Sequence, residues 1–140
     1  MINAIELSSQ IEADLIAHAR QDLPNECCGY ITGVGHVCKT LYKMTNVEAS
    51  PDYFEFAPKE QFQVIKTARK NNEIPLVVYH SHPESPARLS QKDLELLTDP
   101  EMVYLIVSLK NKTPDLKAFR IIDQKIFNVM IDTKEENYVN

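Results

Sequence analysis

Two histidines one residue apart, His80 and His82, and an aspartate eleven residues further on, Asp93, are the residues of this chain whose types and spacing most directly suggest chemistry. The segment before them, 74–79, is apolar and is typical of a buried strand. Because side chains alternate between the two faces of a strand, both imidazoles leave it on the same side and can converge on one ion. Two imidazole nitrogens and a carboxylate oxygen suit zinc, so this spacing predicts a metal site.

Ser90 and Asp93 also have a purely structural interpretation. The pattern Ser-x-x-Asp resembles a capping box, in which both side chains bind backbone amides at the start of a helix. Capping by Ser90 and metal binding by Asp93 are compatible, because this helix would begin just beyond the histidine strand. Three protein ligands leave the fourth tetrahedral position of a zinc ion to a water molecule, which is the arrangement of a catalytic site.

A zinc-bound water still needs a base that takes its proton. Glu26 is a candidate, because it stands directly before a predicted strand. From the residues alone, Glu60, Glu73 and Glu84 have similar claims, and Glu84 is closer in sequence to the histidines. The spacing of the residues therefore leaves the identity of the base open.

The composition is that of an ordinary globular domain. The chain has 140 residues, 44% of them hydrophobic and 25% charged, so we expect one domain over residues 1–140. The net charge of -5 offers no basic surface for nucleic acid or for an anionic membrane. The three cysteines follow no disulfide spacing, and the chain has no basic amino-terminal leader and no apolar run of membrane-spanning length. We therefore expect a cytoplasmic protein with reduced thiols.

The predicted helices are interspersed with several strands, including adjacent hairpin-like pairs, which indicates an α/β or α+β domain with a mixed sheet. In the second helix, Phe62, Ile65 and the pair Ala68-Arg69 have the spacing of one buried face. Gly33-Val34-Gly35 has the composition of a hairpin turn, and the tail from about 133 is expected to be flexible. The predicted helices are 8–21, 58–71 and 90–98, and the predicted strands are 27–32, 36–47, 53–56, 74–79, 102–109, 116–122 and 125–131.

Glu26 within P-N-E-C-C-G, together with H-S-H-P-E-S-P-A-R-L-S-Q-K-D over residues 80–93, resembles the signature of the JAMM, or MPN-plus, metalloproteases. That signature is a distant glutamate, then His-x-His-Pro, then Ser-x-x-Asp after a loop of fixed length. The loop length and the order of elements agree with it over nearly the whole chain. The resemblance implies a single-domain α/β sandwich around a curved mixed β-sheet, with the cytidine-deaminase-like architecture.

The resemblance also implies a role for each residue of the motif. His80, His82 and Asp93 would bind one zinc ion. Glu26 would be the general acid/base that activates the zinc water and later protonates the leaving amine. Ser90 would hydrogen-bond the developing oxyanion or the water.

The same resemblance implies a substrate class. The family hydrolyses peptide or isopeptide bonds, commonly at the C-terminal tail of ubiquitin or of a ubiquitin-like protein. This chain has little room for the insertions with which eukaryotic deubiquitinating members grip ubiquitin. It therefore resembles the compact prokaryotic members, which are associated with ubiquitin-like sulfur-carrier proteins.

Two other interpretations stay open at this point. The first is a non-catalytic scaffold or binding module of the same fold, although this chain retains all five functional positions. The second is a mononuclear iron site, because two histidines and one carboxylate also describe the facial triad of non-haem oxygenases. Those oxygenases typically use a double-stranded β-helix, which does not fit the helices predicted at 8–21 and 58–71.

Overall fold

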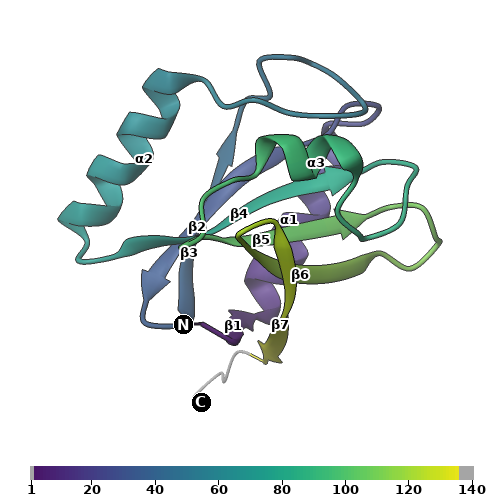
Figure 1. Cartoon of the computed structure of the whole chain (residues 1–140). Helices are drawn as coiled ribbons and strands as arrows, with labels where there is room; N and C mark the ends of the chain where they lie inside the picture. The colour runs from purple at the N-terminus through teal and green to yellow at the C-terminus, as the bar shows by residue number, and fades with distance from the viewer. Residues whose placement is uncertain (1, 136–140) are drawn as a thin grey trace.

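The computed structural model describes residues 2–135, and in them a single sheet of seven strands closes into a barrel (Figure 1). The strand order is β1-β3-β2-β4-β5-β6-β7, and β1 completes the ring by pairing with both β3 and β7. The strands are β1 Ala4–Ser8, β2 Cys28–Val34, β3 Val37–Met44, β4 Ile74–His82, β5 Val103–Ser108, β6 Asp115–Ile122 and β7 Lys125–Lys134. The helices are α1 Ser9–Gln21, α2 Pro58–Lys70 and α3 Gln91–Leu96.

The sheet is mixed, as predicted, but the expected sandwich is wrong. Strands β4 and β5 are parallel, as are the two pairings of β1, and the remaining neighbours are antiparallel. The closure depends on β1, an element that the sequence analysis did not predict. In β1, Ile5 and Leu7 are fully buried, and Glu6 pairs with Val37 of β3. The cytidine-deaminase-like detail of the architecture stays a prediction.

The two faces of the sheet pack against different helices. On one face, α1 covers a core that includes Leu15, Val77 and Leu105. On the other face, a second core includes Val78 of β4 and Leu97, just beyond α3. Because side chains alternate along β4, the residues in register with Val78 point toward α3 rather than α1. His80 and His82 are in this register, so the fold directs both imidazoles to the α3 side.

The predicted starts of the helices are confirmed. The Ser8 hydroxyl accepts a hydrogen bond from the amide of Ile11 at 3.1 Å and so caps α1. Pro58 lies in the first turn of α2, where its missing amide hydrogen is not needed. Ser90 caps α3.

Two details of the predicted elements are wrong. Phe62 is 65% exposed, because α2 packs through a narrower stripe formed by Val64 and Ala68, one turn apart. The turn between β2 and β3 lies at Gly35, which has a φ of +64°, rather than over residues 33–35. Gly33 instead belongs to β2, where a side chain would collide with the backbone of Val37.

Two other predicted segments, a strand and the C-terminal tail, also differ from the structure. Residues 53–56 do not form a strand, and only a single bridge joins Asn46 to Phe56. Thr133 and Lys134, expected in a flexible tail, extend β7 and pair with β1. The rest of that predicted tail, 136–140, lies outside the described residues. The division into one domain over 1–140 stays a prediction, and none of the described helices has the length and apolar character of a membrane span.

Candidate metal centre

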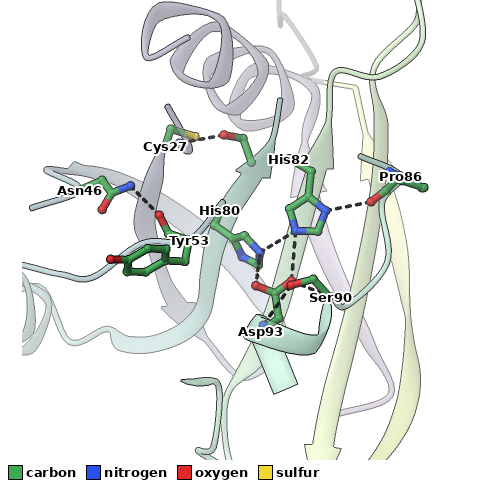
Figure 2. A network of polar contacts seen from close by, with 9 residues as sticks. Cys27, Asn46, Tyr53, His80, His82, Pro86, Ser90 and Asp93 are labelled. Carbon is green, nitrogen blue, oxygen red and sulfur yellow. Dashed lines mark hydrogen bonds and ion pairs between the residues drawn. The ribbon is translucent and has the colours of Figure 1, made fainter. Parts of the chain in front are cut away.

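The structure brings His80, His82 and Asp93 together in one buried cluster (Figure 2). The two histidines end β4, and Asp93 lies in the first turn of α3. The Nε2 atoms of the histidines are 3.2 Å apart, Asp93 Oδ1 lies 3.1 Å from Nε2 of His80, and Asp93 Oδ2 lies 3.0 Å from Nε2 of His82. All three residues are at most 2% exposed. The two histidines and Asp93, which follows His82 by eleven residues, therefore present one donor atom each to a common point.

The spacing of these donor atoms fits a small metal ion. Zinc bonds of about 2.0–2.1 Å place neighbouring tetrahedral ligand atoms about 3.3 Å apart, which is close to the observed separations. Two imidazole nitrogens that face each other and a carboxylate leave more lone pairs than protons at this point. A divalent cation would satisfy all three donors at once.

Different contacts orient the two imidazole rings. His82 Nδ1 lies 2.8 Å from the carbonyl oxygen of Pro86, so a proton on Nδ1 is donated there and Nε2 keeps its lone pair for a ligand bond. Nδ1 of His80 has no hydrogen-bond partner among the described residues. Instead, the ring of Phe54 stacks on the His80 ring, with a centroid distance of 4.9 Å and an interplanar angle of 28°. Packing against Phe54 therefore orients the His80 ring, whereas a hydrogen bond to Pro86 orients the His82 ring.

This stacking leads to a prediction. Phe54→Leu removes the flat ring from His80 but keeps an apolar side chain, and we expect the affinity for zinc to fall about tenfold, as when other supports of a metal ligand are lost. Competition with a chromophoric chelator measures the affinity. Phe62→Leu, at the 65% exposed position on α2, is the matched control and should bind zinc like the wild type. Equal affinities of the two variants would show that packing on His80 contributes nothing.

Electrostatics keep Asp93 in its charged form. Burial alone would raise the pKa of Asp93, but hydrogen bonds with His80 and His82 hold that pKa well below its usual range. Burial lowers the pKa of His80, whereas for His82 burial is outweighed by its contacts with Asp93 and Pro86, which raise the pKa. The carboxylate is thus available as a ligand at neutral pH.

Ser90 and Asp93 form the capping box that the sequence suggested, at the same time as Asp93 faces the histidines. The Ser90 hydroxyl oxygen accepts from the Asp93 amide, and Asp93 Oδ2 accepts from the Ser90 amide, each at 3.0 Å. The box fixes the first turn of α3 and with it the direction of the carboxylate. Because the Ser90 oxygen acts as an acceptor here, its hydroxyl hydrogen remains available for donation.

Glu26 lies next to this cluster through the pairing of β2 with β4. Cys28 pairs with His80, and the amide of Ser81 donates to the carbonyl of Cys27 at 3.1 Å. Continuing this antiparallel register by one more residue places Glu26 opposite His82, on the face that both histidines use. The structure therefore distinguishes Glu26 from the other candidate glutamates.

The Glu26 carboxyl is in an unusual environment. It is 2% exposed, and its Oε1 atom has no hydrogen-bond partner in the described part of the chain. Burial, followed by the negative charges of Asp93 and Asp52, raises the pKa of Glu26 to about 9. In contrast, Glu60 and Glu73 accept hydrogen bonds from threonine hydroxyls. A buried carboxyl with a raised pKa beside a donor cluster is typical of an acid/base group.

Comparison with known proteins agrees with this geometry. The family described as prokaryotic homologs of the JAB domain matches residues 8–122. The chain belongs to this family. The CysO-cysteine peptidase of Mycobacterium tuberculosis (strain ATCC 25618 / H37Rv) is 33% identical over 90% of this chain and 91% of its own length. The desampylase of Haloferax volcanii is 30% identical over 74% of this chain and 80% of its own. The solution structure of a Desulfitobacterium hafniense protein superposes with a TM-score of 0.88 at 39% identity and covers 94% of each chain.

The residues that surround the predicted metal ligands of this JAB domain were not predicted from the sequence. A cavity of about 540 Å³ opens beside Phe54, and aromatic rings from distant segments line it: Tyr30, Tyr53, Phe54, Phe56 and Tyr104. The 53–56 segment thus has two roles, since Phe54 packs in the core and its neighbours border a groove. Its aromatic composition was the only signal of the groove in the sequence.

The raised pKa of Glu26 predicts how the stability of the metal-free JAB domain depends on pH. Between the ordinary value of 4.5 and about 9, the folded state holds a proton that the unfolded chain has lost. The stabilisation from this proton is complete below about pH 4.5 and is lost as the pH rises toward 9. We expect the difference in Tm between Glu26→Gln and the wild type to grow in favour of the variant over this range. Thermal unfolding of chelator-treated protein at pH 5, 7 and 9 tests this, and a constant difference would contradict it.

Proposed function

We propose that this JAB-domain chain is a zinc-dependent peptidase that hydrolyses a peptide or isopeptide bond at the C-terminal tail of a ubiquitin-like or sulfur-carrier protein. The observation that carries the proposal is the convergence of three buried donor atoms beside the buried carboxyl of Glu26, whose Oε1 atom has no hydrogen-bond partner among the described residues. A scaffold has no use for such a carboxyl, which costs stability to bury.

His80, His82 and Asp93 would hold the zinc ion. When bound, zinc polarises the scissile carbonyl and lowers the pKa of a coordinated water toward about 7. A cation beside Glu26 would oppose the negative charges of Asp93 and Asp52, so the pKa of Glu26 would fall below about 9. Glu26 would then take a proton from the attacking water and return it to the leaving amine.

Ser90 would act on the carbonyl oxygen of the bond that is cut. Its hydroxyl hydrogen is free, and its oxygen is held in place by the cap of α3. A fixed donor aimed at an oxygen that gains negative charge stabilises the transition state more than the ground state.

The relatives support the substrate class. Two of them are named CysO-cysteine peptidase and desampylase, and the chain matches each of them over most of their length. The groove of about 540 Å³ beside Phe54 can receive a side chain of an extended tail on its way to the metal. An extended tail also suits recognition by strand addition, which binds through the backbone.

The test uses zinc-loaded wild-type protein and Glu26→Gln with a panel of ubiquitin-like carriers that bear C-terminal extensions. Mass spectrometry should find that the wild type releases the extension of at least one carrier and that Glu26→Gln releases none. The same carriers without extensions control for non-specific proteolysis. Metal analysis of protein purified without added metal distinguishes zinc from a mononuclear iron site. An inactive wild type that holds stoichiometric zinc would count against the proposal and in favour of a binding module.

A further inference from the structure

Residues 46–57, most of the segment between β3 and α2 and here called the 46–57 loop, pass beside the candidate metal centre. The first residue of the loop, Asn46, has a side-chain amide that makes four hydrogen bonds to backbone atoms. The Nδ2 group donates to the carbonyls of Glu26 at 3.1 Å and Tyr53 at 3.0 Å, the second of which is drawn in Figure 2. The Oδ1 atom accepts from the amides of Glu48 at 3.1 Å and Glu55 at 3.2 Å. Two donated and two accepted bonds use the whole hydrogen-bonding capacity of the amide.

These bonds tie the backbone of Glu26 to the 46–57 loop. A second bond does the same, because the Glu26 amide donates to the carbonyl of Ser50 at 2.8 Å. Both backbone polar groups of Glu26 are therefore held by the loop. Oε1 of the Glu26 side chain has no partner among the described residues, so no hydrogen bond to this atom helps the backbone to place the carboxyl.

The same loop supports one of the predicted metal ligands. Phe54 lies in the loop between two of the groups bound by Asn46, Tyr53 and Glu55, and its ring stacks on His80 at 4.9 Å. Nδ1 of His80 has no hydrogen-bond partner in residues 2–135. The stacked ring of Phe54 is therefore the contact that orients the His80 ring. One side-chain amide thus connects the placement of Glu26 with the placement of His80.

We infer that Asn46 is a positioning residue of the site, which fixes Glu26 and the His80 support in one relative arrangement. The inference rests on the proposed function for its catalytic meaning, and on the four hydrogen bonds for its geometry. Asparagine suits the position because it offers two donors and two acceptors on one short side chain. Aspartate has no donor for the carbonyls of Glu26 and Tyr53, and alanine has neither donor nor acceptor. A displacement of about 1 Å at a reacting group is enough to cost about 10²-fold in rate.

The test compares Asn46→Ala and Asn46→Asp with Asn111→Ala, an exposed asparagine in the β5–β6 turn. We expect kcat on an extended carrier to fall about 10–100-fold in both Asn46 variants, with KM changed less than threefold and one zinc per chain retained. Asn111→Ala should match the wild type in kcat, in KM and in zinc content. The aspartate keeps the acceptor for Glu48 and Glu55, so their amides should keep their protection from hydrogen exchange while kcat is still lost. If the alanine variant fails to fold, the aspartate variant decides the question.

A second readout needs no substrate and separates this inference from the proposed function. Titration of the Glu26 side-chain carboxyl by ¹³C NMR in metal-free protein should give a midpoint at lower pH in Asn46→Ala than in the wild type, because a displaced carboxyl gains water. Asn111→Ala should leave the midpoint unchanged. If no carrier is cut by the wild type but the midpoint moves, the proposed function fails and the positioning role stands. An active wild type, with Asn46 variants that match it in kcat and in Glu26 titration, would overturn the positioning role alone.

Discussion

Glu26→Gln is expected to lower the rate of hydrolysis about 10³-fold while the protein keeps one zinc per chain. The amide has nearly the same shape as the carboxyl, so the buried position opposite His82 stays filled. It cannot accept a proton from water or return one to an amine, and general acid–base catalysis is typically worth 10²–10⁴-fold. Glu26 is not one of the three residues whose donor atoms converge, so its replacement removes no predicted metal ligand. Metal analysis and single-turnover cleavage of an extended carrier measure the two quantities on the same samples.

The matched control is Glu84→Gln. Glu84 is the glutamate nearest to the histidines in sequence, but it is exposed, and we expect its replacement to change neither zinc content nor rate. The two variants together show whether the base is the glutamate closest to the histidines in the fold or the one closest to them in the sequence. A Glu26→Gln protein with full zinc and wild-type activity would refute the acid/base role, and a large loss in Glu84→Gln would place that role elsewhere.

The parts of the site that the sequence predicts well are those set by local geometry. His80 and His82 converge because a strand repeats every two residues, and Asp93 faces them because a capped helix starts nearby. Both rules act within a few residues and need no knowledge of the rest of the fold. The starts of α1, α2 and α3 were predictable for the same reason, since each depends on one serine or proline.

The parts that the sequence predicts poorly depend on tertiary contacts. The preference for Glu26 over Glu84 as the proposed base depends on the pairing of β2 with β4, which no spacing reveals. The packing of Phe54 on His80 and the hydrogen bond from Asn46 to the carbonyl of Glu26 join segments about twenty to thirty residues apart. Phe62 was assigned to the core by its helical spacing with Ile65 and Ala68-Arg69, but the sheet offers α2 only a narrow contact along Val64 and Ala68. Barrel closure likewise depends on where β1 pairs rather than on its own five residues.

Asp93→Asn and Ser90→Ala should separate metal binding from helix capping, the two interpretations that the sequence left intertwined. We expect Asp93→Asn to lower zinc affinity by more than about 100-fold, because loss of a ligand should exceed the 10–100-fold cost of losing an outer support. The amide oxygen can still accept from the Ser90 amide, which Asp93 Oδ2 now does at 3.0 Å. The cap of α3 should therefore survive, and metal-free stability should fall only by what the contacts of the Asp93 charge with His80 and His82 contribute.

Ser90→Ala should behave in the opposite way. It removes the acceptor for the Asp93 amide, so metal-free stability should fall by about 0.5–2 kcal/mol, the usual cost of an N-cap. The carboxylate remains, so one zinc per chain should still bind after dialysis, while hydrolysis falls because the donor to the carbonyl oxygen is gone. Chelator competition and denaturant unfolding of the two metal-free variants give both quantities. If Asp93→Asn binds zinc like the wild type, Asp93 is only a capping residue and the two histidines need another partner. If instead both variants lose zinc equally, the cap and the ligand act as one unit, because the carboxylate reaches the histidines only from an ordered first turn of α3.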